Sequence, residues 1–234
     1  MKRPLALVAL LLLSTPALAD SLVVVESTLP AFAPGAMLDG DKPITLPEKS
    51  KLVLISDAGK TVSLSGPFSG KPGTGGKAAD SRLTTALATL VRTSQEDANS
   101  VGAIRAASIK TRADALMVNL SESGDYCIAD PKAVEMTRYA DEKWPTVSVN
   151  AVKGDKVSDL SWPAGGNHAA WPEALPIEDG ATYLVSQQGK DSRTMLVLHL
   201  IEDKAPTDAH RAVFMAEKGC LEQAKMLLAL LKKG

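Results

Sequence analysis

Two cysteines are the residues of this chain whose types most directly allow covalent chemistry. Cys127 and Cys220 are the only cysteines among the 234 residues. In an oxidising compartment an even pair usually forms a structural disulfide. This bridge would close a long loop and contribute about 4 to 5 kcal/mol in the chain-entropy model. A pair of buried thiols is the alternative, whereas a redox couple has no Cys-x-x-Cys motif to support it.

Three histidines are the candidates for acid–base chemistry or metal binding. His168 is expected in a loop, His199 in a strand and His210 in a helix. Their spacing fits neither H-x-x-x-H nor H-E-x-x-H, so the local sequence offers no zinc site. No G-x-S-x-G elbow marks a serine nucleophile, although a triad can assemble from distant residues. We therefore predict no catalytic residue, no metal and no cofactor, and keep a hydrolase with a non-local site as a third hypothesis.

Each of the three tryptophans, Trp144, Trp162 and Trp171, precedes a proline. Proline forces extended geometry on the residue before it and ends a strand ladder. The indoles are therefore expected at strand ends, where they cover the rim of the core. The alternative is a stacking platform for a sugar or a peptide. Its predicted ligand-binding edge consists of Trp162, Asn167, His168 and Trp171.

The first 19 residues have the features of a secretory signal peptide. Two basic residues precede an apolar run at 5–13, a proline follows, and Ala17 and Ala19 place small residues at a cleavage site. Cleavage after Ala19 would leave 215 of the 234 residues. No later apolar stretch is long enough to span a bilayer. The chain is expected to be exported to the periplasm, with no stable membrane insertion after cleavage.

The charge balance and the length limit the classes of function. Removal of the signal would leave 24 basic residues against 27 acidic ones, a net charge of −3. This balance argues against a nucleic-acid partner or an anionic membrane surface. The length allows one large domain or two small ones with a real core. Aromatic residues make up only 4% of the chain, so aliphatic residues must fill that core.

Residues 20–70 are predicted to form a small β module. Strands are expected at 21–26 and 43–46, and a hairpin at 51–56 and 61–65. The following region, 71–113, is expected to contain a Gly-rich linker, a short helix and a connector. The Gly/Pro-rich linker starts at 66, and the helix ends near Arg92. Its apolar face is predicted to consist of Leu83, Leu87, Leu90 and Val91.

The apolar pattern changes to a period of two between residues 114 and 204. Strands are expected at 115–120, 126–129, 134–140, 146–152, 156–162, 181–187 and 193–201. Seven short strands at this spacing predict an antiparallel, immunoglobulin-like β-sandwich. The fold class is therefore mainly β.

Residues 205–234 return to a helical period and are predicted to form a helical hairpin. Thr207 is the expected N-cap of the first helix, and Gly219 separates it from the second at 220–232. The predicted inward residues are Ala209, Val213 and Ala216, followed by Leu221, Ala224, Leu227, Leu228 and Leu231. These faces are expected to cover one side of the sandwich, and an apolar face offered to a partner is the alternative.

Two groups of short motifs together cover most of the chain after residue 20. The first contains Val23-Val24-Val25, Pro34-Gly35, Leu38, Ile44-Thr45-Leu46-Pro47, Leu52 to Ile55, Gly59 and Leu64 to Pro67. The second contains Tyr126-Cys127-Ile128, Trp162-Pro163-Ala164-Gly165, Trp171-Pro172, Asp179-Gly180-Ala181-Thr182-Tyr183 and Gly219-Cys220-Leu221-Glu222-Gln223-Ala224. The first group resembles envelope proteins of the FecR type, which relay signals across an inner membrane. The second resembles exported proteobacterial proteins of unknown function. The resemblance implies an envelope setting and a β fold, and no catalytic residue carries over.

These observations favour a non-enzymatic periplasmic interaction module. Its expected partner is an envelope protein, and its expected role is accessory to a signalling or assembly complex. The alternative is a glycan- or peptidoglycan-binding protein that uses Trp162 and Trp171. Exposed, coplanar indoles would favour the alternative, and indoles buried at the rim would count against it.

Overall fold

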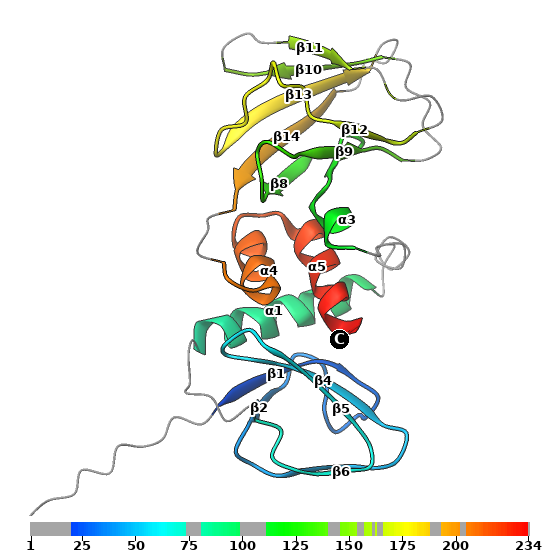
Figure 1. Cartoon of the computed structure of the whole chain (residues 1–234), viewed down its shortest axis with the longest axis vertical. Coiled ribbons are helices and arrows are strands. Elements are labelled where there is room, and N and C mark those ends of the chain that lie inside the picture. The colour runs from blue at the N-terminus through cyan, green and yellow to red at the C-terminus, as the bar shows by residue number, and fades with distance from the viewer. Residues whose placement is uncertain are drawn as a thin grey trace, which may run out of the picture.

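The computed structural model describes residues 20–73, 81–98, 111–139, 146–153, 157–160, 162, 166–187, 193–201 and 205–233. The protein is mainly β, as predicted from the sequence. Two β units lie at the two ends of an elongated molecule, and a layer of helices lies between them (Figure 1). The predicted signal peptide, Trp144 and most of the predicted connector lie outside the described residues. Among the described residues, no helix is both long and apolar enough to cross a membrane.

The first β unit is built on a four-stranded sheet with the order β2-β1-β4-β5. A separate pair of strands, β3 and β6, packs against this sheet. The bounds are β1 (Ser21–Ser27), β2 (Met37–Asp39), β3 (Ile44–Leu46), β4 (Lys51–Ser56), β5 (Thr61–Ser65) and β6 (Phe68–Gly70). The four predicted strands are present. β2 and β6 are additional, and β6 lies in the segment that was expected to be a linker.

Both faces of this sheet are apolar, because β1 and β4 contain runs of consecutive apolar residues and successive side chains of a strand point to opposite faces. Leu22 and Val24 of β1 belong to a core shared with β3 and β6. Val23 and Val25 belong instead to a second core, which the helices complete. A sheet with two apolar faces needs a cover on each side. This requirement explains why helices pack against the first unit.

The helical layer combines elements from distant parts of the chain. It contains α1 (Ser81–Ala98), α3 (Arg112–Leu116), α4 (Asp208–Glu217) and α5 (Leu221–Lys233). The predicted face of α1 is confirmed, because Leu83, Leu87, Leu90 and Val91 are buried in the helical core. The helix is longer than expected, since it continues past Arg92 to Ala98.

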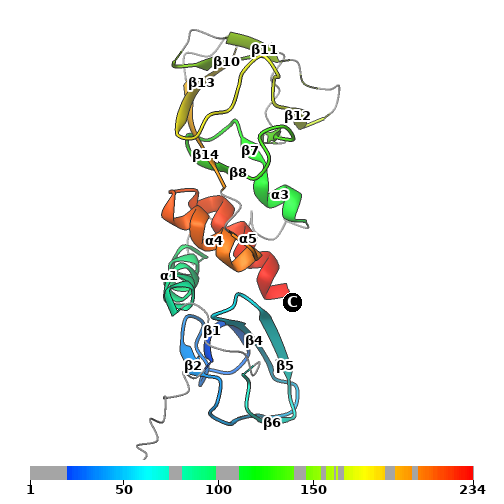
Figure 2. The ribbon, with the colours of Figure 1, turned by 60° about the vertical axis from the view of Figure 1, so that its left-hand side comes forward.

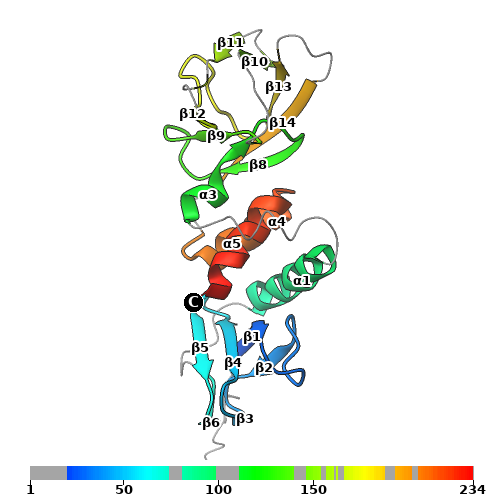
Figure 3. The same cartoon turned by 90° about the vertical axis from the view of Figure 1, so that its right-hand side faces the viewer.

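The C-terminal helices were expected to cover one side of the second β unit, and this expectation is wrong. Their buried faces pack with α1 and with Val23, Val25, Val53 and Ile55 of the first sheet (Figure 3). Ala209 of α4 is buried as predicted, but the other buried residues are Ala212 and Met215, while the predicted Val213 and Ala216 are only partly buried. Leu221 of α5 is 43% exposed, and Gln223 is buried in its place. Thr207 is the N-cap of α4, as predicted.

The second β unit has a five-stranded sheet and a three-stranded sheet around one core (Figure 2). The first sheet has the order β11-β10-β13-β14-β8, and the second has the order β12-β9-β7. The bounds are β7 (Val118–Asn119), β8 (Gly124–Ile128), β9 (Glu135–Thr137), β10 (Val147–Ala151), β11 (Val157–Leu160), β12 (His168–Ala170), β13 (Ala181–Gln187) and β14 (Arg193–Leu200).

Three details of the chain from residue 112 to residue 200 correct the sequence-based expectation. The sheets are mixed, because β14 pairs with β8 and β7 pairs with β9 in parallel. Parallel pairing requires a long crossover, and the strands between β8 and β14 provide it. The predicted strand at 115–120 begins as helix α3, because Thr111 and Asp114 form a capping box that favours a helical turn. His168 lies in β12 rather than in a loop.

Gly219, which separates α4 from α5, is a position where a side chain should cost stability. Its φ is +86°, and an added Cβ would lie 3.2 Å from Oδ2 of Asp125. Gly180 has a similar φ of +72° with open space around it. We expect Gly180→Ala to cost about 1 kcal/mol from backbone strain. Gly219→Ala should cost about 2 kcal/mol because Asp125 must also move.

Urea unfolding followed by circular dichroism measures both free energies, and Gly180→Ala is the matched control for strain alone. Equal losses for the two variants would show that the contact with Asp125 has no energetic consequence.

Candidate functional site

The disulfide predicted from the sequence is present and joins the second β unit to the helical layer. Cys127 of β8 and Cys220, directly before α5, are bonded with a Cα–Cα distance of 5.8 Å. Both cysteines are fully buried, and neither is free, which excludes the buried-thiol alternative. The bond lies where the core of the helices meets the edge of the five-stranded sheet. Its position indicates a structural role.

Gln223 reinforces this junction and was not singled out from the sequence. Its side chain is 1% exposed, and its Oε1 accepts a hydrogen bond of 2.6 Å from the Cys127 N–H. Its Nε2 donates to the carbonyls of Cys127 and Met117, at 3.2 and 3.4 Å. β8 is the last strand of its sheet, so one amide side chain takes the place of a neighbouring strand there. A polar residue in an otherwise apolar helix face was the only signal in the sequence.

Of the four residues of the predicted ligand-binding edge, Trp171 faces the core. Its indole is 9% exposed, and its Nε1 donates a 2.8 Å hydrogen bond to the Leu175 carbonyl. Its ring meets the Tyr183 ring edge to face, with centroids 5.0 Å apart. Burial raises the pKa of the Tyr183 hydroxyl, which stays protonated and donates to the Pro176 carbonyl. The polar ends of both rings are thus satisfied inside the protein.

Trp162, Asn167 and His168 lie closer to the surface, beside an arginine that the sequence analysis did not select. The guanidinium carbon of Arg138 lies 5.0 Å from the centre of the Trp162 ring, a cation–π distance. Nη2 of Arg138 donates to the Gly166 carbonyl at 3.1 Å, and its backbone N–H donates to the Asn167 carbonyl. His168 is exposed on β12, opposite Thr137 of β9.

The remaining nitrogens of Arg138 lie inside the protein. Nε and Nη1 are buried and have no hydrogen-bond partner among the residues that the structure describes. Because both nitrogens are inaccessible and Nη2 already bonds to Gly166, a ligand carboxylate could pair with this guanidinium only after Arg138 moves. The guanidinium itself occupies part of the Trp162 surface. The edge therefore offers one half-buried indole beside a cation, and Trp171 does not extend it into a flat two-ring platform.

The three histidines are held by structural contacts or exposed. Nε2 of His199 lies 2.7 Å from Oδ1 of Asp125, and Nδ1 of His210 lies 2.8 Å from the hydroxyl of its own helix cap, Thr207. Neither of these two imidazole contacts involves a serine or cysteine side chain. The described part of the chain contains no cluster of three or more acidic, histidine or cysteine side chains that could hold a metal.

Comparisons with family models, curated proteins and solved structures find no match to this chain. The resemblance to FecR-type proteins therefore rests on the sequence motifs alone.

Proposed function

We propose that the protein is a non-enzymatic interaction module of the periplasm, accessory to a signalling or assembly complex of the envelope. The observation that carries this proposal is the placement of two β units, each with its own core, at the two ends of the molecule (Figure 1). One unit shares an apolar core with the helices, and the other is bound to them by a disulfide. Such an arrangement presents two different surfaces on one molecule, as an adaptor requires.

The fold types that we assign to the two units, together with the disulfide and the signal-peptide features, support a role as a periplasmic interaction module. The second unit, taken as an immunoglobulin-like sandwich, and the first, taken as a FecR-like module, belong to protein classes that bind other proteins. The disulfide fits an oxidising compartment. The signal-peptide features of the first 19 residues fit export, and the low net charge fits a protein partner better than a nucleic acid.

Glycan binding is the second candidate, and the contact between Trp162 and Arg138 is the observation that favours it. An indole face can stack on a sugar ring, and the positive charge of Arg138 beside it would favour an acidic glycan. Trp171 weakens this candidate, because its indole packs on Tyr183 inside the core. A glycan site here would depend on one tryptophan instead of two.

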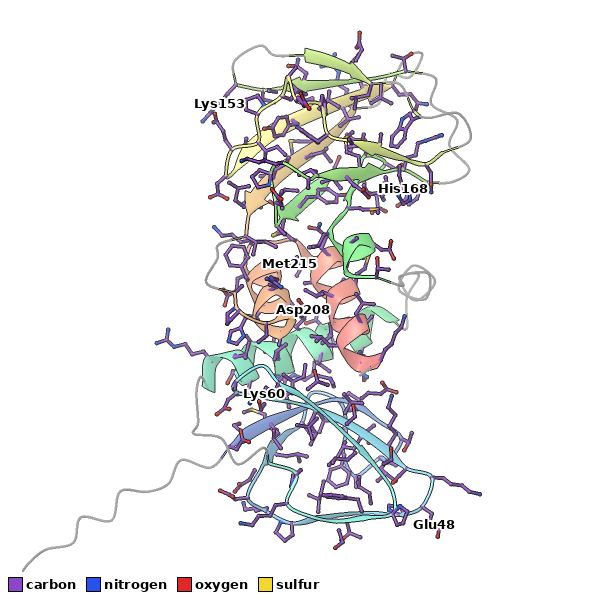
Figure 4. All side chains as sticks on the ribbon, viewed as in Figure 1. Glu48, Lys60, Lys153, His168, Asp208 and Met215 are labelled. Atoms are coloured by element: carbon purple, nitrogen blue, oxygen red, sulfur yellow. A yellow bond between two sulfur atoms is a disulfide. The ribbon has the colours of Figure 1, made fainter. Side chains whose placement is uncertain are left out.

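Site-specific photocrosslinking in intact cells tests the main proposal. A photoreactive residue replaces Glu48 at the end of the first unit, or Lys153 or His168 on the second unit (Figure 4). Met215, which is fully buried in the helical layer, is the negative-control position (Figure 4). We expect one envelope protein to be captured reproducibly from at least one exposed position and not from Met215.

Two results would contradict the proposal. Absence of any protein crosslink from the three exposed positions and from a fourth at Lys60, beside β5, would count against a stable protein partner (Figure 4). Retention of the protein on peptidoglycan, with loss of retention in Trp162→Ala, would establish the glycan alternative. In that case Trp171→Phe is the matched control, because its ring faces the core.

A further inference from the structure

The last strand of the first sheet, β5, has an open edge. The sheet order β2-β1-β4-β5 leaves β5 with β4 as its only neighbouring strand in the described part of the chain. Gly66 N–H donates to the Ser50 carbonyl, and Ser56 N–H donates to the Lys60 carbonyl. Because hydrogen-bonded pairs alternate along an antiparallel ladder, Val62 and Leu64 bond to β4. The N–H and C=O groups of Thr61, Ser63 and Ser65 therefore point to the open edge.

The open edge of β5 is not shared by β8, another strand at the end of a sheet. β8 is also the last strand of its sheet and has the same length of five residues. Its edge is occupied by Gln223, which bonds to both the N–H and the C=O of Cys127. Among the described residues, no side chain or backbone group bonds to the outer edge of β5.

The side chains of β5 also lack the features that protect edge strands. Charged residues, prolines and bulges usually prevent a free edge from pairing with another chain. The sequence of β5, Thr-Val-Ser-Leu-Ser, contains no charge and no proline. Val62 and Leu64 are only partly buried at the margin of the first core, so an added strand would cover them. β5 lies at the outer margin of the unit in Figures 2 and 3.

We propose that β5 is a docking strand, which binds an extended segment of a partner protein as an additional antiparallel strand. The segment has apolar residues at alternate positions, to cover Val62 and Leu64. It has an acidic residue at its C-terminal end, because that end lies beside Lys60 in an antiparallel pair. Lys60 is exposed and forms no ion pair within the described residues. This inference rests on the proposed function and names the surface that would perform it.

Amide hydrogen exchange measured by NMR on the purified protein tests the docking strand. The probe is a nine-residue synthetic peptide in which valine alternates with threonine, ending in a C-terminal glutamate. We expect the peptide to protect the amides of Thr61, Ser63 and Ser65 from exchange. The amides of Val62 and Leu64 should change little, because they already bond to β4. The same peptide with a C-terminal lysine should bind more weakly.

Two substitutions at Ser63 provide a matched pair. Ser63→Pro removes an edge N–H without removing a bond to β4, and should weaken peptide binding by at least about tenfold. Ser63→Thr keeps the N–H and should retain the affinity. Lys60→Glu leaves the backbone intact and should reverse the preference, so that the lysine peptide binds better. This variant keeps the test decisive if Ser63→Pro fails to fold.

Three outcomes would overturn the inference. The peptide does not protect the three edge amides, or Lys60→Glu leaves the peptide preference unchanged. In the third, the protein forms a dimer that Ser63→Pro abolishes, which would make a second copy of this chain the occupant. A partner captured from other positions in the crosslinking experiment, together with failure here, would leave the proposed function standing and remove only the docking strand.

Discussion

Replacing both Cys127 and Cys220 with alanine is expected to lower the free energy of unfolding by about 4 to 5 kcal/mol. The bond joins residues separated by 93 positions in the sequence, so its loss frees a long loop in the unfolded chain. This amount is comparable with the total free energy of unfolding of many domains. The bond also ties β8 to the start of α5, so its loss should let the second β unit unfold before the helical layer.

Urea unfolding monitored by circular dichroism measures this effect, with the single variant Cys127→Ala as a control that adds one free thiol at Cys220. Reduction of the native protein should give the same midpoint as the double variant. Intact mass after alkylation should show no blocked thiol without reductant and two with it. A double variant within about 1 kcal/mol of the native protein would show that the bond constrains little, because the unfolded chain is already compact.

Local patterns of the sequence predicted most of the individual elements. Alternation located β13 at its observed bounds and β4 and β5 with their hairpin turn. Helical periodicity identified the buried face of α1 and the helices on both sides of Gly219. Such patterns are local, because they depend on which face of one element is apolar. They carry no information on which element covers that face.

The arrangement of the elements could not be predicted for this reason. The faces of α4 and α5 suit any apolar surface, and the nearest unit in the sequence was the second one. The first sheet has apolar side chains on both faces, so it has the larger apolar surface that another element must bury. Similarly, the parallel pairing of β8 with β14 depends on a crossover of many residues. Helix α3 depends on one capping box in a segment with alternating apolar residues.

The candidate site illustrates the same limit. The cysteine count and the predicted export predicted the disulfide, because a chain with two cysteines has a single possible pairing. Proline after tryptophan predicted strand ends for Trp162 and Trp171 but not which indole faces the core. Arg138 became part of the edge through a contact across 24 residues, for which the sequence has no periodic signal. The open edge of β5 follows from sheet order, which alternation along one strand does not determine.

Replacement of one polar side chain is expected to lower the free energy of unfolding most at Gln223. Leucine has a similar volume but cannot hydrogen-bond, so Gln223→Leu would leave the Cys127 N–H and two carbonyls without partners. Each such buried group costs about 1 kcal/mol or more. We expect a loss of about 3 kcal/mol in the free energy of unfolding. Glu222→Gln, on the exposed side of the same helix turn, is the control and should change stability by less than about 0.5 kcal/mol.

Gln223→Glu tests whether this site tolerates a charge, through the pH dependence of stability. A protonated glutamic acid can accept from the Cys127 N–H and donate to a carbonyl, whereas a carboxylate in this buried site would face the Cys127 and Met117 carbonyls. Burial and these carbonyls should raise the pKa of the introduced group above its unfolded value of about 4.3. A raised pKa means that the folded state binds the proton more tightly. The stability of Gln223→Glu should therefore be close to native below about pH 4 and fall as the pH rises through the folded pKa.

Urea unfolding of Gln223→Glu and of the native protein between pH 4 and pH 8 checks this prediction. The difference between the two free energies should grow with pH and then level off, because no further proton is released above the folded pKa. A difference that is constant over this range would show that the amide acts by packing alone. A difference that shrinks with pH would show that the site favours the carboxylate, as it would if a cation reached Gln223. Growth of the difference would establish that burial and the two carbonyls at the edge of β8 exclude a carboxylate, so that this site requires a neutral side chain, as the amide of Gln223 is.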